Sequence, residues 1–235
     1  MDGTTTQDGR APRRAWSVDA ATLRAFVVDA NDGIVATAGL LEGFAGAGAS
    51  DSVLLLAASA ATIAGSLSIG GARWAEEAAE RDAQLVLAAE EAAQLAANPD
   101  DEIAELAAYW ERKGLTPALA LEVARQLSAK DALAAQLESE HGIASIPYVA
   151  STVRAGALAA LSFLVGALVP LLVTTLVPGR IEAWAILAAV VLSLGLTSVV
   201  AWRSGHLSFP RVVTRALTVG VGTVLVGYVA GSFLL

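Results

Sequence analysis

The stretch AGALAALSFLVGALVPLLVTTLVPG, residues 155–179, contains no charged side chain. A helix needs about 20 predominantly apolar residues to cross the hydrocarbon core of a bilayer. Three other uncharged runs of comparable length occur at residues 52–72, 183–202 and 216–235. The sequence therefore predicts an all-α polytopic membrane protein rather than a soluble domain.

The composition supports this class and excludes several kinds of chemistry. The chain is 55% hydrophobic and only 16% charged, whereas soluble domains are about 25% charged. It has no cysteine and only two histidines, which excludes disulfides, thiolate sites and a histidine-rich metal cluster within one chain. Glu138 and His141 have the Glu-x-x-His spacing of di-iron bundles, but the sequence holds one copy. With no phosphate-binding loop, Ser/His/Asp set or basic nucleic-acid surface, we expect neither an enzyme nor a nucleic-acid partner.

A fifth run, residues 23–48, is long enough to span a bilayer but carries Asp29, Asp32 and Glu42. Ionisable groups at membrane depth are costly and usually functional. The two aspartates are three residues apart, so a helix places them on one face, where they suit a divalent cation or a proton relay. Asp29 is alternatively a water-exposed interface residue, or a partner of Arg24. Asp32 is the better candidate ligand, and Glu42 is expected near the outer mouth or along the path.

The acidity of the chain belongs to an insertion at residues 73–150. That segment holds 15 of the 23 acidic residues and six of the 15 basic ones, a balance of 6 − 15 = −9 against −8 for the whole chain. Ala, Leu, Glu and Gln dominate it, and these are strong helix formers. An acidic helix is often only a solvated face, but oxygen-only ligand sets also suit divalent metal ions.

Helix-boundary signals divide the insertion into three helices. Asn98 and Thr116 are expected N-caps, each followed by a proline suited to the first turn. Gly114 and Gly142 are expected terminators. The predicted helices cover residues 73–97, continuous with the preceding span, then 100–112 and 117–140.

The distribution of Lys and Arg predicts the orientation. With the N-terminus inside, 14 of the 15 basic residues fall on the cytoplasmic side, as the positive-inside rule requires. The expected organisation is a disordered cytoplasmic tail (1–22), two spans (23–72), the cytoplasmic acidic domain (73–150) and three spans (151–235). The C-terminus is then outside, and the expected location is the cell inner membrane.

Several motifs in this order resemble one known family. They are DANDGIVATAGL (29–40), AGSLSIGG (64–71), EEAAQLAANPDDEIAEL (90–106), ERKGLTPALALEVARQLSAKDALAAQLESEHGI (111–143) and ALSFLVGALVPLL (160–172). The chain resembles the vacuolar iron transporter family in its bacterial form, from about residue 23 to the C-terminus. The resemblance implies five transmembrane helices and a homodimer whose translocation path lies at the dimer interface. It also implies a cytoplasmic three-helix metal-binding domain, with ferrous iron or manganese exported from the cytosol against protons.

The resemblance implies Asp32 as a path residue and Glu91, Glu102, Glu105 and Glu140 as metal ligands, and the sequence itself adds further candidates. Together, the residues expected along the path are Asp29, Asn31, Asp32, Glu42 and Ile69, and those expected to bind metal are Asp32, Glu91, Glu102, Glu105, Glu138 and Glu140. No permanently bound cofactor is expected, since the metal is the substrate. Gly33 and Gly39 would allow two copies of the first helix to approach closely.

Departures from the family pattern leave a second hypothesis open. Ile69 replaces a methionine, Arg73 replaces a glutamate, Gln94 replaces a further glutamate, and Gln136 and Leu137 occupy positions of soft or acidic ligands. Losing a thioether removes part of the preference for ferrous iron. The alternative to a transporter is therefore a non-transporting, membrane-anchored metal buffer or sensor with a degraded path.

Overall fold

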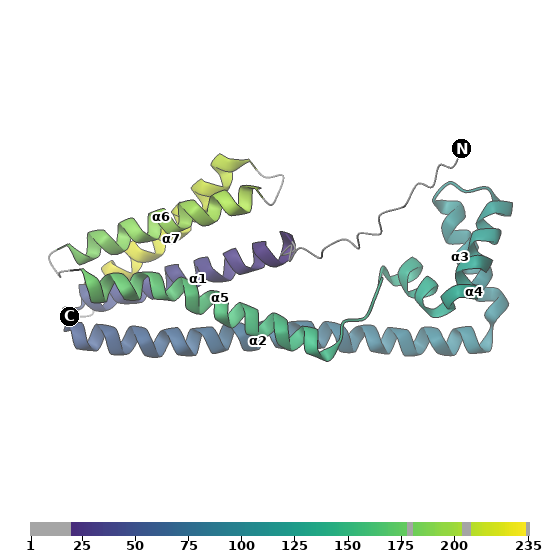
Figure 1. Ribbon diagram of the computed structural model, residues 1–235, viewed down its shortest axis with the longest axis horizontal. Coiled ribbons are helices and arrows are strands. Elements are labelled where there is room, and N and C mark those ends of the chain that lie inside the picture. The colour runs from purple at the N-terminus through teal and green to yellow at the C-terminus, as the bar shows by residue number, and fades with distance from the viewer. Residues whose placement is uncertain (1–19, 178–180, 204–207, 234–235) are drawn as a thin grey trace, which may run out of the picture. The chain divides into compact units, whose positions relative to one another are not determined.

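The computed structural model describes residues 20–177, 181–203 and 208–233, and the regular structure within these ranges is helical. The predicted tail, residues 1–22, lies outside the described residues up to residue 19. Figure 1 shows seven described helices: α1 (Ala20–Gly46), α2 (Asp51–Ala97), α3 (Pro99–Arg112), α4 (Pro117–His141), α5 (Val149–Leu176), α6 (Glu182–Arg203) and α7 (Phe209–Phe233). The all-α prediction is confirmed.

Four helices, α2, α5, α6 and α7, are long and apolar enough to cross a membrane. The polytopic character follows from them. The helix α1 has a suitable length of 27 residues, but the charges of Arg24, Asp29, Asp32 and Glu42 interrupt its apolar surface. A fifth span therefore stays a prediction.

The helix α2 joins the predicted second span to the first helix of the acidic insertion. It runs without a break for 47 residues, as the sequence predicts. Ala, Leu and Glu maintain helix propensity where the composition changes from apolar to charged. The helix ends at Ala97, because Pro99 disfavours the helical conformation at Asn98.

The chain divides into two compact units, which are described separately. The first contains the described residues up to Ser66 and from Leu161 onward. In it α1 packs against α6 and α7 (Figure 1). Its core is formed by buried side chains of α1, α2, α6 and α7: Ile34, Ala38, Leu41, Leu54, Ala58, Ile186, Val190, Leu194 and Val224.

Glycines let the helices of the first unit pack backbone against backbone. A Cβ at Gly33 would collide with the Phe163 carbonyl oxygen of α5, and one at Gly231 would collide with the Gly43 carbonyl oxygen of α1. A Cβ at Gly39 would press on Thr223 of α7. The close approach that Gly33 and Gly39 allow is therefore to α5 and α7 of the same chain, and not to a second copy of α1 as expected.

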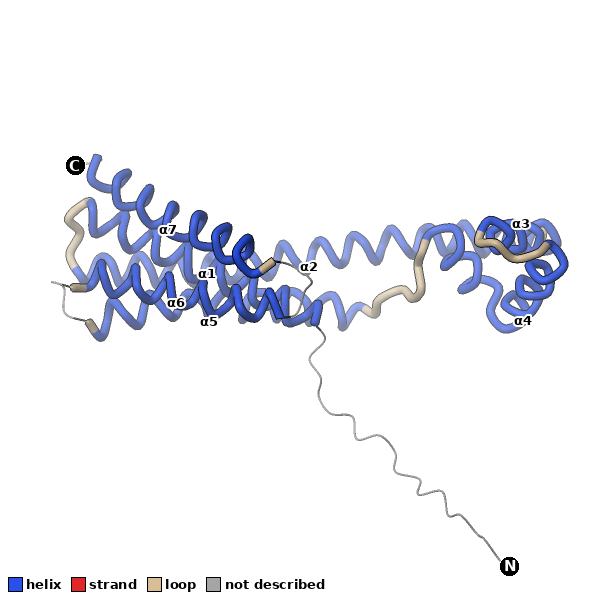
Figure 2. The backbone as a smooth tube through the Cα atoms, turned by 90° about the horizontal axis from the view of Figure 1, so that it is seen from above, coloured by secondary structure: helices blue, strands red, loops and turns tan. Residues whose placement is uncertain are grey.

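The second unit, Leu67–Ala160, holds the acidic insertion. Figure 2 shows its helices α3 and α4, which pack on each other around Leu106, Ala107, Ala120 and Ala124. The predicted boundaries of α3 and α4 agree with the observed ones to within one residue. Gly114 adopts a φ of +102° just after α3, as expected of a glycine that ends a helix.

The predicted caps of α3 and α4 are present only in part. Pro99 and Pro117 occupy the first turns as expected. The side chains of Asn98 and Thr116, however, make no capping hydrogen bond within the described part of the chain. In these two turns the prolines, which need no N–H partner, supply the start signal.

A kink at Asp131 interrupts α4. Asp131 has φ −165° and ψ 93°, outside the helical region. Its carboxylate accepts a hydrogen bond from the Ala134 N–H at 3.0 Å, so it acts as an N-cap for the last part of the helix. The helix then ends at Gly142 (φ +68°), whose N–H bonds to the Glu138 carbonyl at 3.2 Å, as in an αL cap.

Candidate functional site

Acidic side chains from three helices of the second unit converge. Their ligand atoms form two groups, Glu91–Glu140–His141 and Glu102–Glu105–Glu140, and within each group these atoms lie within 4.8 Å of one another. Glu140 belongs to both groups. The arrangement can hold divalent cations, for which carboxylate oxygen and imidazole nitrogen are ordinary ligands.

Each helix contributes to the cluster for a local reason. Glu102 and Glu105 are one turn apart on α3, so they share a face. Glu91 lies near the end of the long α2. Glu140 and His141 end the part of α4 that follows the Asp131 kink. Four of the five glutamates predicted as ligands, Glu91, Glu102, Glu105 and Glu140, are thus brought together.

The cluster gathers like charges around two buried carboxyl groups, Glu91 and Glu102, while Glu105, Glu140 and His141 are exposed. Glu102 is buried, with 6% of its surface exposed. Burial, followed by the charges of Glu91, Glu105 and Glu140, raises its pKa above the usual value. Burial and the charges of Glu91 and Glu105 likewise raise the pKa of Glu140, while His141 opposes the shift. A bound cation would relieve this repulsion.

Gln136 orients the Glu102 carboxylate. This buried side chain is 1% exposed, and its Nε2 donates to the Glu102 backbone oxygen at 2.6 Å and to Glu102 Oε2 at 3.0 Å. The Ser139 hydroxyl donates to Gln136 Oε1 at 3.3 Å. Such outer hydrogen bonds fix the direction of a ligand oxygen, so Gln136 is a positioning contact for Glu102.

The structure separates two other residues from the cluster and adds one. Glu138, predicted as a ligand, is exposed and belongs to neither group within the described ranges. Gln94 is also exposed. His141 was not predicted as a ligand. Its signal in the sequence is its position, directly after Glu140 and before the terminating glycine.

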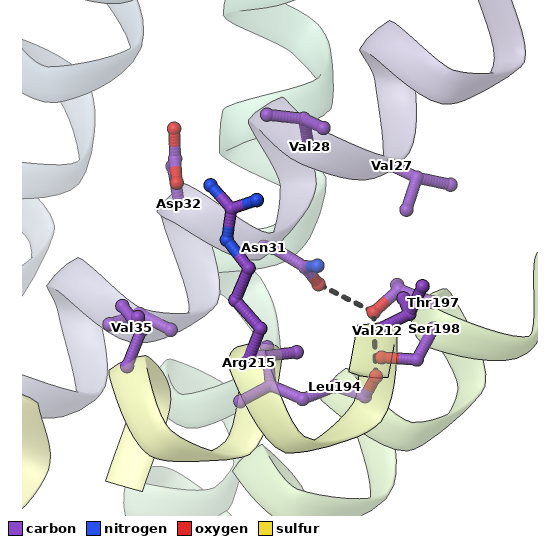
Figure 3. A pocket seen from close by; sticks show the side chains of 12 residues that line it. Val27, Val28, Asn31, Asp32, Val35, Leu194, Thr197, Ser198, Val212 and Arg215 are labelled. Carbon is purple, nitrogen blue, oxygen red and sulfur yellow. Dashed lines mark hydrogen bonds between the residues drawn. The ribbon is translucent and has the colours of Figure 1, made fainter. Parts of the chain in front are cut away.

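The first unit contains a pocket of about 430 Å³ beside Asp32. The side chains around it come from α1, α6 and α7 (Figure 3). They are Val27, Val28, Asn31, Asp32, Val35, Leu194, Thr197, Ser198, Val212, Arg215, Ala216 and Val219. Of the predicted path residues, Asn31 and Asp32 therefore share one cavity.

Polar groups line one side of this pocket. The Thr197 hydroxyl donates to Asn31 Oδ1 at 2.6 Å, joining α6 to α1 (Figure 3). Ser198 is 2% exposed, and its Oγ has no hydrogen-bond partner in the described structure. Sequence reasoning missed both hydroxyls and Arg215. The signal for the first two is a Thr-Ser pair inside an otherwise apolar run, whereas Arg215 was taken only as an orientation marker.

The other predicted path residues lie elsewhere. Asp29 is 7% exposed, so the expectation that it is wet does not hold within the single chain. Asp32, by contrast, is exposed. Glu42 is 4% exposed, and its Oε1 has no hydrogen-bond partner among the described atoms. Ile69 is half-buried on α2, in the second unit.

A helical membrane protein with an aspartate beside an internal pocket and a cluster of acidic residues able to hold metal belongs to the broad class of polytopic cation-handling proteins. Comparison narrows the class: the VIT family matches residues 23–232, and the chain belongs to this family. Proteins of the family are transporters rather than enzymes, with metal as substrate and no implied bound cofactor.

Named relatives agree with the family assignment. The chain is 34% identical to a vacuolar iron transporter of Acanthamoeba castellanii over 210 residues, covering 85% of this chain and 77% of that protein. It is 26% identical to vacuolar iron transporter 1 of Eucalyptus grandis and 24% identical to that of Arabidopsis thaliana, each over 89% of this chain and 82% of the relative.

Proposed function

We propose that the chain is a divalent metal transporter that exports ferrous iron, manganese or both from the cytoplasm. The observation that carries the proposal is the acidic cluster, in which Glu140 is shared between two candidate ligand groups. The names of the relatives support iron as cargo. The cluster gathers the ion, and Asp32 with Asn31 receives it along the path.

We further propose that the working unit is a homodimer. Asp32 is an exposed carboxylate on α1, the proposed fifth span, and an ionised group facing lipid is costly. A second copy seated on this face would remove Asp32 from lipid and place two carboxylates along one path. This arrangement suits a divalent cation, because two carboxylates match its charge.

The proposed orientation follows the basic residues. The N-terminus and the acidic domain face the cytoplasm of a cell whose inner membrane holds the five spans, and the C-terminus faces outside. Protons moving inward would drive metal outward. Asp32 and Glu42 are the carboxylates able to carry those protons, since each belongs to α1 within the proposed membrane region.

A non-transporting metal buffer or sensor is the second candidate, and one observation favours it. Arg215 lines the same pocket as Asp32 (Figure 3), and a fixed cation there opposes entry of a metal ion. Arg73 gives this candidate less support than its sequence position suggested. Its Nη1 pairs with Glu76 Oε2 of the same helix at 3.2 Å.

Flux measurement separates the two candidates. The full-length protein is reconstituted in liposomes, and transport of Fe²⁺ and Mn²⁺ is recorded with and without a pH gradient. The transporter proposal predicts metal flux that increases when the gradient drives protons against the metal. Metal binding in micelles without flux of either ion under both conditions would favour the buffer or sensor.

A further inference from the structure

The group Glu91–Glu140–His141 differs from its neighbour in containing an imidazole. The buried member of this group is Glu91. The Glu91 side chain is 3% exposed, and its Oε1 has no hydrogen-bond partner in the part of the chain that the structure describes. Buried carboxylate oxygens are normally satisfied. The Glu91 carboxyl group shares a side-chain hydrogen bond with Glu102, so the unpartnered Oε1 is the atom that points to a missing ligand.

The imidazole does not meet that need by itself. His141 Nε2 lies 3.7 Å from Glu91 Oε2, which is longer than a hydrogen bond. Two ligand atoms about 2.1 Å from one ion at a tetrahedral angle lie about 3.4 Å apart. The observed separation of 3.7 Å is thus close to that of two atoms sharing an ion. Glu91 Oε1 takes no part in this contact and is available to bind a ligand.

Access to the group comes from the side of His141. The imidazole is 30% exposed, while Glu91 opposite it is buried. The left-handed Gly142 ends α4 directly after His141, which fixes the backbone that presents the ring. An ion could therefore enter past the imidazole and reach the buried carboxylate.

We infer that His141 is a nitrogen ligand that makes this group selective for borderline transition-metal ions. The inference rests on the proposed function, because Glu140 would serve the cargo metal in both groups. Imidazole suits Fe²⁺, Co²⁺, Ni²⁺ and Zn²⁺, whereas all-oxygen sets suit Mg²⁺, Ca²⁺ and Mn²⁺. The cluster then consists of one mixed nitrogen–oxygen position beside one oxygen-only position.

The two histidines of the chain allow a direct test. The His206→Gln variant leaves His141 as the single imidazole, provided that the purification tag contains no histidine. The full-length variant in micelles is loaded with Cu²⁺ as a spectroscopic probe, and electron spin echo modulation reports nitrogen of a coordinated imidazole. The same protein with His141→Gln added is the comparison. Calorimetry with Zn²⁺ and with Mn²⁺ gives both affinities.

The inference predicts imidazole modulation in His206→Gln and its loss when His141→Gln is added. Zn²⁺ affinity should fall at least about tenfold, with Mn²⁺ affinity changed less than about twofold because the oxygen-only group remains. Metal binding without imidazole modulation, or equal losses for the two ions, would overturn the role of His141 while leaving the proposed function standing. No binding of any of these ions would overturn both.

Discussion

Glu102 is a buried residue of the acidic cluster whose ionisation the fold opposes. Its pKa is raised above 4.5 by burial and by three neighbouring carboxylates. The folded state then binds more protons than the unfolded state between pH 4.5 and the raised pKa. This contribution to stability is present below pH 4.5 and is lost as the pH rises through the raised pKa.

The Glu102→Gln variant should remove that dependence. Without metal, the melting temperature of the wild-type protein should rise relative to the variant as the pH falls from 7 toward 4.5. Thermal melts in micelles at several pH values measure the difference. Parallel plots of melting temperature against pH for the two proteins would show that the pKa of Glu102 is not raised in the folded state.

Arg215 is the residue that most affects the Asp32 pocket. In water, a unit charge about 8 Å from a divalent ion interacts with it by about 1 kcal/mol, or about fivefold in affinity. Arg215→Gln should therefore lower the KM for Mn²⁺ transport by about this factor, and Arg215→Lys should leave it nearly unchanged. The control is Arg211→Gln, one turn earlier on α7, exposed and outside the lining of the pocket.

Stopped-flow uptake into proteoliposomes gives the KM of each variant. Equal effects of the Arg211 and Arg215 substitutions would show that only the overall surface charge matters. A higher KM for Arg215→Gln would show that this arginine holds the pocket open instead of opposing the ion.

At the scale of the element, α7 depends on which of its glycines touch α1. A Cβ at Gly231 meets the Gly43 carbonyl oxygen, whereas one at Gly222 meets nothing within 4 Å. Gly231→Ala should cost about 1–3 kcal/mol through overpacking. Gly222→Ala should be neutral or stabilising by up to about 1 kcal/mol, since alanine favours the helix.

Chemical or thermal denaturation in micelles compares these two substitutions on one helix. The packing explanation would be wrong if both variants lost the same stability. It would also be wrong if Gly231→Ala matched the wild-type protein.

Sequence reasoning located the elements well because each had a local cause. Runs of about 20 uncharged residues indicated the apolar helices. The backbone restrictions of Pro99, Gly114 and Pro117 indicated where helices begin and end. The kink at Asp131 escaped prediction, because most residues around it are strong helix formers and a single aspartate inside a helix costs little.

The candidate site was predicted less completely, since convergence in space leaves little trace along the chain. The spacing of Glu102 and Glu105 indicated one face of one helix. The approach of His141 to Glu91 depends on where α4 resumes after its kink, which no local pattern encodes. Thr197 and Arg215 likewise reach the Asp32 pocket through helix packing alone.

At the scale of the whole molecule, the proposed dimer can be tested directly because the chain has no cysteine. If two copies of α1 face each other near Asp32, the Asp32→Cys variant should form a disulfide-linked dimer under mild oxidant in native membranes. Leu192→Cys, at an apolar position of α6 that is 73% exposed, is the control and should stay monomeric. Equal cross-linking of both variants, or of neither, would contradict an axis beside Asp32.

The central claim is that Asp32 lies on a metal path fed by the acidic cluster. Metal flux through proteoliposomes containing full-length Asp32→Ala tests it most directly, alongside calorimetry of the same preparation. If Asp32 lies on the path, flux is abolished while metal binding to the acidic cluster persists, because Asp32 and the cluster belong to different units of the chain. Flux equal to that of the wild-type protein would contradict the claim.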